Sequence, residues 1–161
     1  MRGRTTFVLV LALAAAAIFA QDAGQGGRRK QLVSKNFTRE FTEQFLMTMV
    51  KSRPIDAFAL IKTVTPESET DIETTRSSTE QLLDNVRPSY GRIIGYELLE
   101  TKALGNSFVR YEYLLKFERN ALHCRFLYYN NTPTGQQGEN WIPVGIWFDG
   151  NLGDLFDNIG K

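Results

Sequence analysis

Cysteine and histidine are almost absent from this chain of 161 residues, which contains one of each, Cys124 and His123. A lone cysteine excludes an intramolecular disulfide, and the two residues together are too few ligands for a zinc site of the usual kind. They are neighbours, and consecutive side chains of a strand point to opposite faces, so on a strand they cannot form a nucleophilic pair. We expect Cys124 to be a small buried hydrophobe and His123 to be a surface partner of Lys116 across a strand pair.

Sequence motifs for phosphate and acyl-transfer chemistry are absent as well, since the chain has neither a glycine-rich phosphate loop nor a Gly-x-Ser-x-Gly elbow. One run is rich in acids: Glu67, Glu69, Asp71 and Glu73. Acids are favoured in the first turns of a helix, which explains the run without a bound cation. We therefore expect no cofactor, no metal and no catalytic residue.

A large net charge is also lacking, because 19 basic residues are balanced by 18 acidic ones. Two of the basic residues, Arg2 and Arg4, lie ahead of the chain's long apolar run. Near-neutral proteins offer no general attraction to nucleic acid or to an anionic membrane, both of which need a clustered basic surface. We expect no nucleic-acid partner.

Only one long apolar run is present, over residues 7–19. Positive charges precede it and the polar pair Gln21-Asp22 follows it, which is the order of a secretory signal peptide with cleavage between Ala20 and Gln21. The run is shorter than the roughly 20 residues that span a bilayer, and no cysteine follows it to carry a lipid. The pattern predicts a secreted or periplasmic protein that is soluble after cleavage and has no membrane anchor.

The chain divides into four segments: a signal peptide (1–20), a flexible leader (21–33), one α+β domain (34–149) and a tail (150–161). The leader is rich in glycine and too polar to offset its ordering entropy. The roughly 140 residues that follow the signal are enough for one domain with a real core. Glycines in the tail favour an irregular end.

The first part of the domain has a helical pattern. Aromatic or apolar residues recur at every fourth position: Phe37, Phe41, Phe45 and Met49. The spacing predicts a long helix with one aromatic face, ended by Pro54. A second helix is predicted from Pro54 to about Thr65, and a third over 68–86, ended by Arg87-Pro88.

The second part alternates with the period of strands. We expect strands over 92–102, 109–118, 121–129 and 141–149, with Arg119-Asn120 as a two-residue turn that pairs Glu118 with Ala121. That register places Tyr113 opposite Phe126 and Tyr111 opposite Tyr128 on an apolar face. In the last strand, Ile142, Val144, Ile146 and Phe148 are expected to face the core, with Trp141 and Trp147 pointing outward.

Three helices followed by a four-stranded antiparallel meander, with a few aromatic positions, resemble the nuclear-transport-factor-like superfamily. The residues that carry the resemblance are the stripe of Phe37, Phe41 and Phe45, the Ser89-Tyr90-Gly91 start of the first strand, and Trp141, Gly145, Phe148 and Asp149. It covers residues 34–149 and implies a cone-like half barrel, with N-terminal helices packed in the concave face of a curved four-stranded antiparallel sheet. A clear short strand between the second and third helices, present in the better-known enzymes of the superfamily, is missing. Its members include ketosteroid-isomerase-like enzymes, small-ligand binders and immunity proteins, so the fold leaves the function open.

Two sets of residues are candidate sites. Tyr111, Tyr113 and Tyr128 lie on the predicted inner face, where they could line a pocket for a small apolar ligand. An isomerase of the ketosteroid type needs an inner carboxylate as well, but the strand acids Glu112 and Glu118 fall on the outer face.

The predicted outer face is too apolar for a surface that meets only water. The residues expected to form a partner interface, such as that of a homodimer, are Leu114, Leu127, Tyr129, Trp141 and Trp147. We thus consider three functions, in this order: a non-enzymatic exported domain that binds a small apolar ligand or a protein partner; a small isomerase or hydrolase with an inner carboxylate and tyrosine; and an immunity or inhibitor-type binding protein.

Overall fold

The computed structural model describes residues 30–153 and 155. The predicted signal peptide with its Ala20-Gln21 cleavage site, most of the leader and most of the tail lie outside the described residues. The elements are α1 (Lys35–Lys51), the 3-10 turn η1 (Pro54–Ala57), α2 (Phe58–Ile61), α3 (Glu69–Tyr90), β1 (Ile93–Leu104), β2 (Phe108–Phe117), β3 (Ala121–Asn130) and β4 (Trp141–Asp149).

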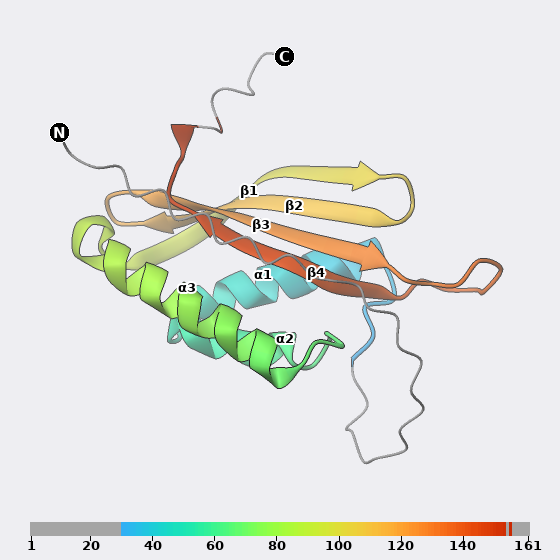
Figure 1. The fold of residues 1–161 in the computed structure, drawn as a ribbon. Helices are drawn as coiled ribbons and strands as arrows, with labels where there is room; N and C mark the ends of the chain where they lie inside the picture. The colour runs from blue at the N-terminus through green and yellow to red at the C-terminus, as the bar shows by residue number, and fades with distance from the viewer. Residues whose placement is uncertain (1–29, 154, 156–161) are drawn as a thin grey trace.

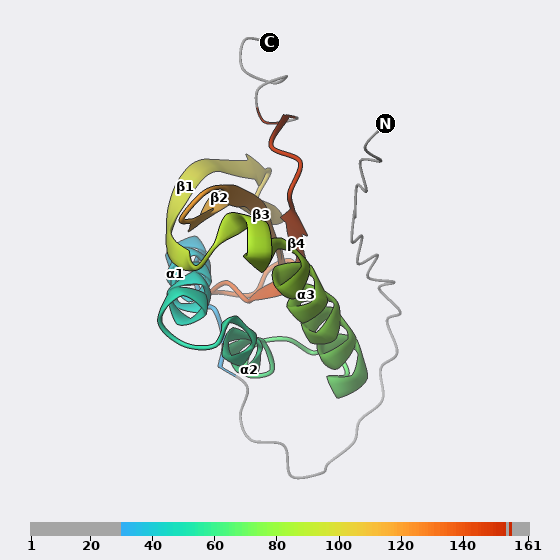
Figure 2. The ribbon, with the colours of Figure 1, turned by 90° about the vertical axis from the view of Figure 1, so that its left-hand side faces the viewer.

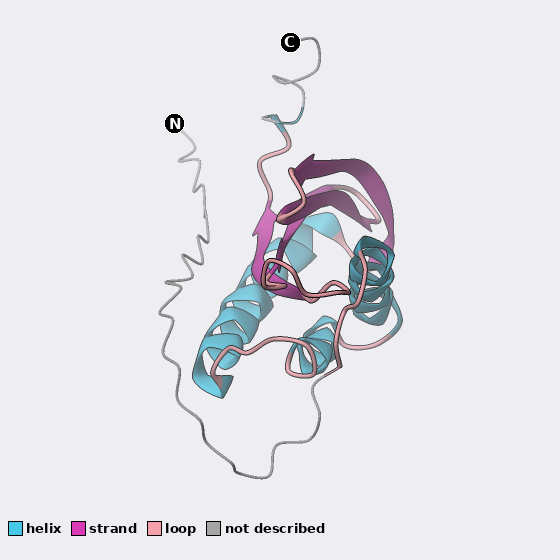
Figure 3. Ribbon diagram, turned by 90° about the vertical axis from the view of Figure 1, so that its right-hand side faces the viewer, coloured by secondary structure: helices cyan, strands magenta, loops and turns pink. Residues whose placement is uncertain are grey.

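The fold belongs to the α+β class, as expected. The strands form an antiparallel sheet in the order β1-β2-β3-β4, which is not closed into a barrel. All helices lie against one face of the sheet (Figure 1), and the end-on views show that the sheet curves over them (Figures 2 and 3). We call the face that meets the helices the inner face and the opposite one the outer face.

Helix α1 begins at the N-cap Ser34, whose hydroxyl accepts a hydrogen bond from the Phe37 backbone N–H at 3.3 Å. Its buried residues are Thr38, Phe41, Thr42, Phe45, Leu46 and Met49. Phe37, the first residue of the predicted aromatic face, does not belong to the core, because its side chain is 45% exposed. Since a helix turns once in about 3.6 residues, a four-residue spacing drifts by about 40° at each step, and Thr38 takes the inward position at this end.

Helix α3 follows the N-cap Ser68, continues through Pro88 and ends at Tyr90, four residues beyond its predicted end at residue 86. A proline in the last turn removes only one backbone donor, so the helix can continue past it. It ends at Gly91, whose positive φ of 85° suits glycine and whose N–H donates to the Arg87 carbonyl. The predicted second helix is a 3-10 turn that runs into the short α2.

The hairpin of β2 and β3 has a longer turn than predicted. Lys116 pairs with Ala121, so Tyr113 lies opposite Cys124 and not Phe126. The Phe117 N–H donates to the Asn120 carbonyl at 2.8 Å, which closes the turn. Because the error is two residues, an even number, every side chain keeps its predicted face. Cys124 is fully buried, as expected.

Strand β4 contains a bulge that reverses its first half. Leu127 pairs with Gly145 and the next residue, Tyr128, pairs with Pro143, which leaves Val144 without a partner. Trp141 therefore faces inward and is 1% exposed, so its assignment to the partner interface is wrong.

The packed part of the chain begins before Ser34. Leu32 forms a bridge to Trp141 at the edge of β4 and is 1% exposed. The Lys30 N–H donates to the Thr63 carbonyl at 2.8 Å. The end of the predicted leader is thus part of the fold.

Candidate functional site

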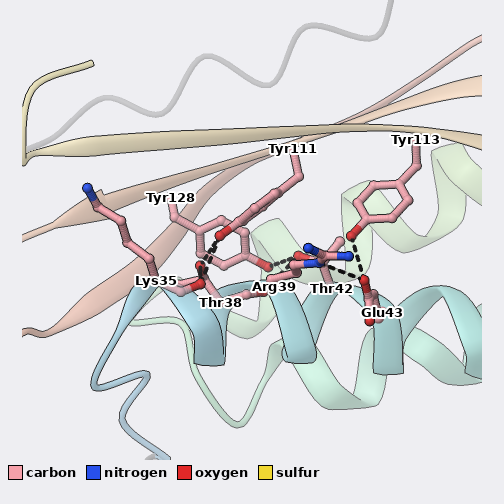
Figure 4. A network of polar contacts seen from close by, with 8 residues as sticks. All are labelled: Lys35, Thr38, Arg39, Thr42, Glu43, Tyr111, Tyr113 and Tyr128. Carbon is pink, nitrogen blue, oxygen red and sulfur yellow. Dashed lines mark hydrogen bonds and ion pairs between the residues drawn. The ribbon is translucent and has the colours of Figure 1, made fainter. Parts of the chain in front are cut away.

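The three predicted tyrosines are brought together between α1 and the inner face of the sheet (Figure 4). Tyr111 donates its hydroxyl proton to the Lys35 carbonyl at 2.8 Å and lies 2.9 Å from the Thr38 hydroxyl. Tyr128 lies 2.7 Å from the Thr42 hydroxyl, one helical turn further on. These two phenols therefore bind α1.

The third tyrosine, Tyr113, meets a carboxylate. Its hydroxyl donates to Glu43 of α1 at 3.4 Å, and Glu43 also accepts from Arg39 at 2.9 Å. Burial, with a contribution from the charge of Glu43, raises the pKa of Tyr113 well above its ordinary value. Tyr113 is thus a neutral, fully buried donor beside an anion.

Sequence reasoning missed Glu43, because it searched for inner carboxylates only on the strands. The signal available in the sequence was the four-residue spacing of Arg39 and Glu43, because side chains four residues apart lie on the same side of a helix. An inner carboxylate beside a tyrosine is what acid–base chemistry would require. Here the carboxylate is paired with Arg39, and Tyr96 packs edge-on against Tyr113 with ring centroids 6.1 Å apart. That these tyrosines bind a ligand stays a prediction.

On the outer face, His123 has a different partner from the one expected. Its Nε2 lies 3.0 Å from a carboxylate oxygen of Glu112, whereas Lys116 pairs with Glu97. His123 is 8% exposed, so it is not a surface residue. Burial lowers the pKa of His123, although the charge of Glu112 acts in the opposite direction. The longer hairpin turn is the reason, because it moves Lys116 away from His123 and Glu112 toward it.

One end of the outer face carries a continuous apolar row. Leu104 pairs with Phe108, Phe108 with Tyr129 and Tyr129 with Ile142, so the row crosses all four strands. Leu104 is 75% exposed and Tyr129 37% exposed, and the Phe108 and Tyr129 ring centroids are 5.0 Å apart. Only Tyr129 of this row was predicted, because the row depends on the pairing of all four strands.

The middle of the outer face is charged. Arg110 forms a 2.6 Å ion pair with Glu112, and Arg125 lies over the Trp147 ring, 5.9 Å from its centroid. Gly145 has no side chain, and the ring of Trp147 lies where a Cβ would stand. Leu114, Leu127 and Trp147 of the predicted interface do lie on this face, half-buried.

Two arginine nitrogens of this face lack partners. The Nε atoms of Arg110 and Arg125 are buried and have no hydrogen-bond partner among the described residues. Buried donors are rarely left unpaired in folded proteins. The isolated chain therefore leaves hydrogen-bonding capacity unused at the centre of the outer face.

Comparisons with known protein families, curated proteins and solved structures found no match to this chain. Among residues 30–153, no group of three or more histidine, cysteine, aspartate or glutamate side chains is placed to hold a metal ion. Within the same described part, no helix has the length and apolar character needed to cross a bilayer.

Proposed function

We propose that the protein is an exported, non-catalytic binding domain that pairs with a second copy of itself through the outer face of its sheet. The observation that carries the proposal is the apolar row of Leu104, Phe108, Tyr129 and Ile142. The row is exposed at Leu104 and Tyr129 and half-buried at Phe108 and Ile142, and contact between this apolar surface and water is unfavourable. Covering the row with a second copy would remove that cost.

The charges of the outer face support a second copy as the partner. The cations are Lys102, Arg110, Lys116 and Arg125, and the anions are Glu97, Glu100, Glu112 and Asp149. A face with four charges of each sign can be complementary to itself, as a two-fold interface requires. A strongly acidic or basic partner would gain little from such a face.

The area of the outer face limits the affinity expected for the dimer. Four strands about 4.8 Å apart and about nine residues long present roughly 550 Å² per copy, or about 1,100 Å² in total. That is the lower end for specific protein interfaces, so we expect a dissociation constant in the micromolar range or weaker.

Sedimentation velocity on residues 21–161 tests the proposal with a matched pair of variants. Tyr129→Glu places a charge in the apolar row, and we expect it to abolish the dimer. Met47→Glu is the control, because Met47 is similarly exposed, at 42%, but lies on α1. Equal dimerisation of both variants would reject the outer face as the interface.

A second candidate function, a small isomerase-type enzyme, is favoured by the contact between Glu43 and Tyr113. Glu43 would act as the base, and Tyr113, which is fully buried, would orient the Glu43 carboxylate through their hydrogen bond. The test is deuterium exchange at the α-carbon of an enolisable cyclic ketone, followed by NMR. The enzyme hypothesis requires exchange above the rate in buffer that is lost in Glu43→Gln and Tyr113→Phe.

We also propose, from the order of the helices and strands, that the chain is a distant relative of the nuclear-transport-factor-like superfamily. Export follows from the predicted signal peptide. N-terminal sequencing of the protein recovered outside the expressing cell should begin at Gln21. Recovery of exported protein that begins at Met1 would contradict the prediction.

A further inference from the structure

Most charged side chains on the strands of the outer face are paired within the chain. The pairs are Lys102 with Glu100, Lys116 with Glu97, and Arg110 with Glu112. Arg125 of β3 and Asp149 of β4 remain, and neither forms an ion pair with any residue that the structure describes. On the described strands, a single copy thus carries one unpaired cation and one unpaired anion on this face.

Arg125 and Asp149 are near neighbours, yet the structure holds their charges apart. Arg125 lies opposite Trp147 and Asp149 opposite His123, so the two are diagonal neighbours on adjacent strands. The Trp147 ring covers the position where a Cβ of Gly145 would stand, which places the ring on the side of Trp147 away from Asp149. The Arg125 guanidinium lies over this ring, 5.9 Å from its centroid, and is thereby drawn away from Asp149.

Both side chains are half-buried, so each has lost part of its hydration without gaining an opposite charge. Asp149 accepts one hydrogen bond, from the Asn151 backbone N–H at 2.8 Å, and Arg125 has none with a described residue. A partner with an anion near Arg125 and a cation near Asp149 would supply both missing charges. A second copy has this arrangement, since a two-fold axis makes every contact twice with the roles exchanged.

We propose that Arg125 of one copy pairs with the partner's Asp149, and that the same pair forms a second time with the roles exchanged. The proposal rests on the proposed dimer and names the contacts that make a second copy its specific partner. A two-fold axis that runs along the strands between β3 and β4 fits both sets of contacts. It places Tyr129 against the partner's Ile142 in the apolar row, and it brings Arg125 within side-chain reach of the partner's Asp149, two residues further along the strand.

Charge reversal tests the pairing by sedimentation velocity on residues 21–161. Arg125→Glu places a carboxylate against the partner's Asp149, and Asp149→Lys places an ammonium group against the partner's Arg125. We expect each variant alone to have a dissociation constant at least about tenfold higher than the natural sequence, because like charges would then meet twice in each dimer. Arg87→Glu is the control: it reverses an exposed charge of α3, on the helical side of the sheet, and should leave the dissociation constant unchanged.

An equimolar mixture of the two reversed variants gives the decisive result. In a mixed dimer the introduced carboxylate meets the introduced ammonium group, and the natural Asp149 meets the natural Arg125, so both contacts are again attractive. We expect the mixture to dimerise with about the affinity of the natural sequence. No recovery in the mixture, or single variants that dimerise like the natural sequence, would overturn the pairing and leave the outer-face dimer intact. A natural sequence that stays monomeric would reject the dimer itself, and the pairing with it.

Salt dependence keeps the pairing falsifiable if a reversed variant fails to fold. Raising the NaCl concentration from about 0.05 M to about 0.5 M screens charges and should weaken the natural dimer. The neutral variants Arg125→Gln and Asp149→Asn introduce no repulsion, and their dimers should be less sensitive to salt. Equal salt sensitivity in the natural sequence and both neutral variants would also overturn the pairing.

Discussion

In the hydrogen bond between Tyr128 and Thr42, Tyr128 is the donor, and each partner's substitution should therefore have a different effect on stability. The Thr42 hydroxyl has one proton and donates it to the Thr38 carbonyl at 2.9 Å. Tyr128 must therefore be the donor in the 2.7 Å contact between the two hydroxyls. Both side chains are almost completely buried, so water cannot replace either partner.

Tyr128→Phe removes the donor and leaves Thr42 bonded to Thr38, so it should cost about one net hydrogen bond, or about 1 kcal/mol. Thr42→Val keeps the shape but strands the Tyr128 hydroxyl as a buried donor, and should cost about 2 to 3 kcal/mol. The double variant should lose less than the sum, because the second substitution removes a hydroxyl that is already stranded.

Urea unfolding followed by far-UV circular dichroism measures these differences. In thermal unfolding, each 1 kcal/mol should correspond to roughly 3 to 6 °C for a domain of this size. If Tyr128→Phe lowers the unfolding free energy as much as Thr42→Val does, or if the two losses add, then Tyr128 is not the donor in its contact with Thr42.

Three further predictions concern other parts of the fold. Burial lowers the pKa of His123 below its unfolded value, so the free energy of unfolding should fall as the pH drops from about 7 through the folded-state pKa. Urea unfolding at a series of pH values measures this fall, and His123→Gln should reduce it. Gly145→Ala should destabilise the protein by about 1 to 3 kcal/mol through overlap with Trp147, and the loss should shrink in a Trp147→Ala background, whereas an equal loss in both would refute the close approach. Phe37→Ser should change the unfolding free energy by less than about 0.5 kcal/mol, whereas Phe45→Ala should lower it by about 3 to 5 kcal/mol. Similar losses in the two variants would show that Phe37 is part of the core.

The period of the side chains was enough to predict much of the sheet. Alternation along β2 and β3 assigned Tyr111, Tyr113, Cys124, Phe126 and Tyr128 to one buried face, and the structure confirms it. The turn length could not be read in the same way, because a two-residue and a four-residue turn preserve the same faces. The register, and with it the partner of His123, was therefore wrong.

The bulge in β4 shows what periodicity cannot detect. A strict two-residue period places Trp141 on the outer face, but one extra residue at Val144 turns it inward. Pro143 gave a hint, since proline in a strand favours an edge or a bulge. The bulge lies where the pairing of β3 with β4 shifts, between Leu127 and Tyr128, and that pairing is not visible in the sequence of β4 alone.

The candidate sites were the least predictable part. Glu43 meets Tyr113 only because α1 crosses β2 at a particular angle and rotation, which no local pattern encodes. The apolar row likewise exists only after four separate strands have been aligned.

The central claim is that the outer face of the sheet is covered by a second copy. The most direct measurement is a dilution series of ¹⁵N-labelled residues 21–161 by NMR, from about 1 mM down to about 20 µM, a range that brackets a micromolar dissociation constant. The account predicts concentration-dependent shifts and broadening at Phe108, Tyr129 and Ile142, and none along the exposed side of α1. Spectra that do not change with concentration, or changes confined to the helices, would contradict it.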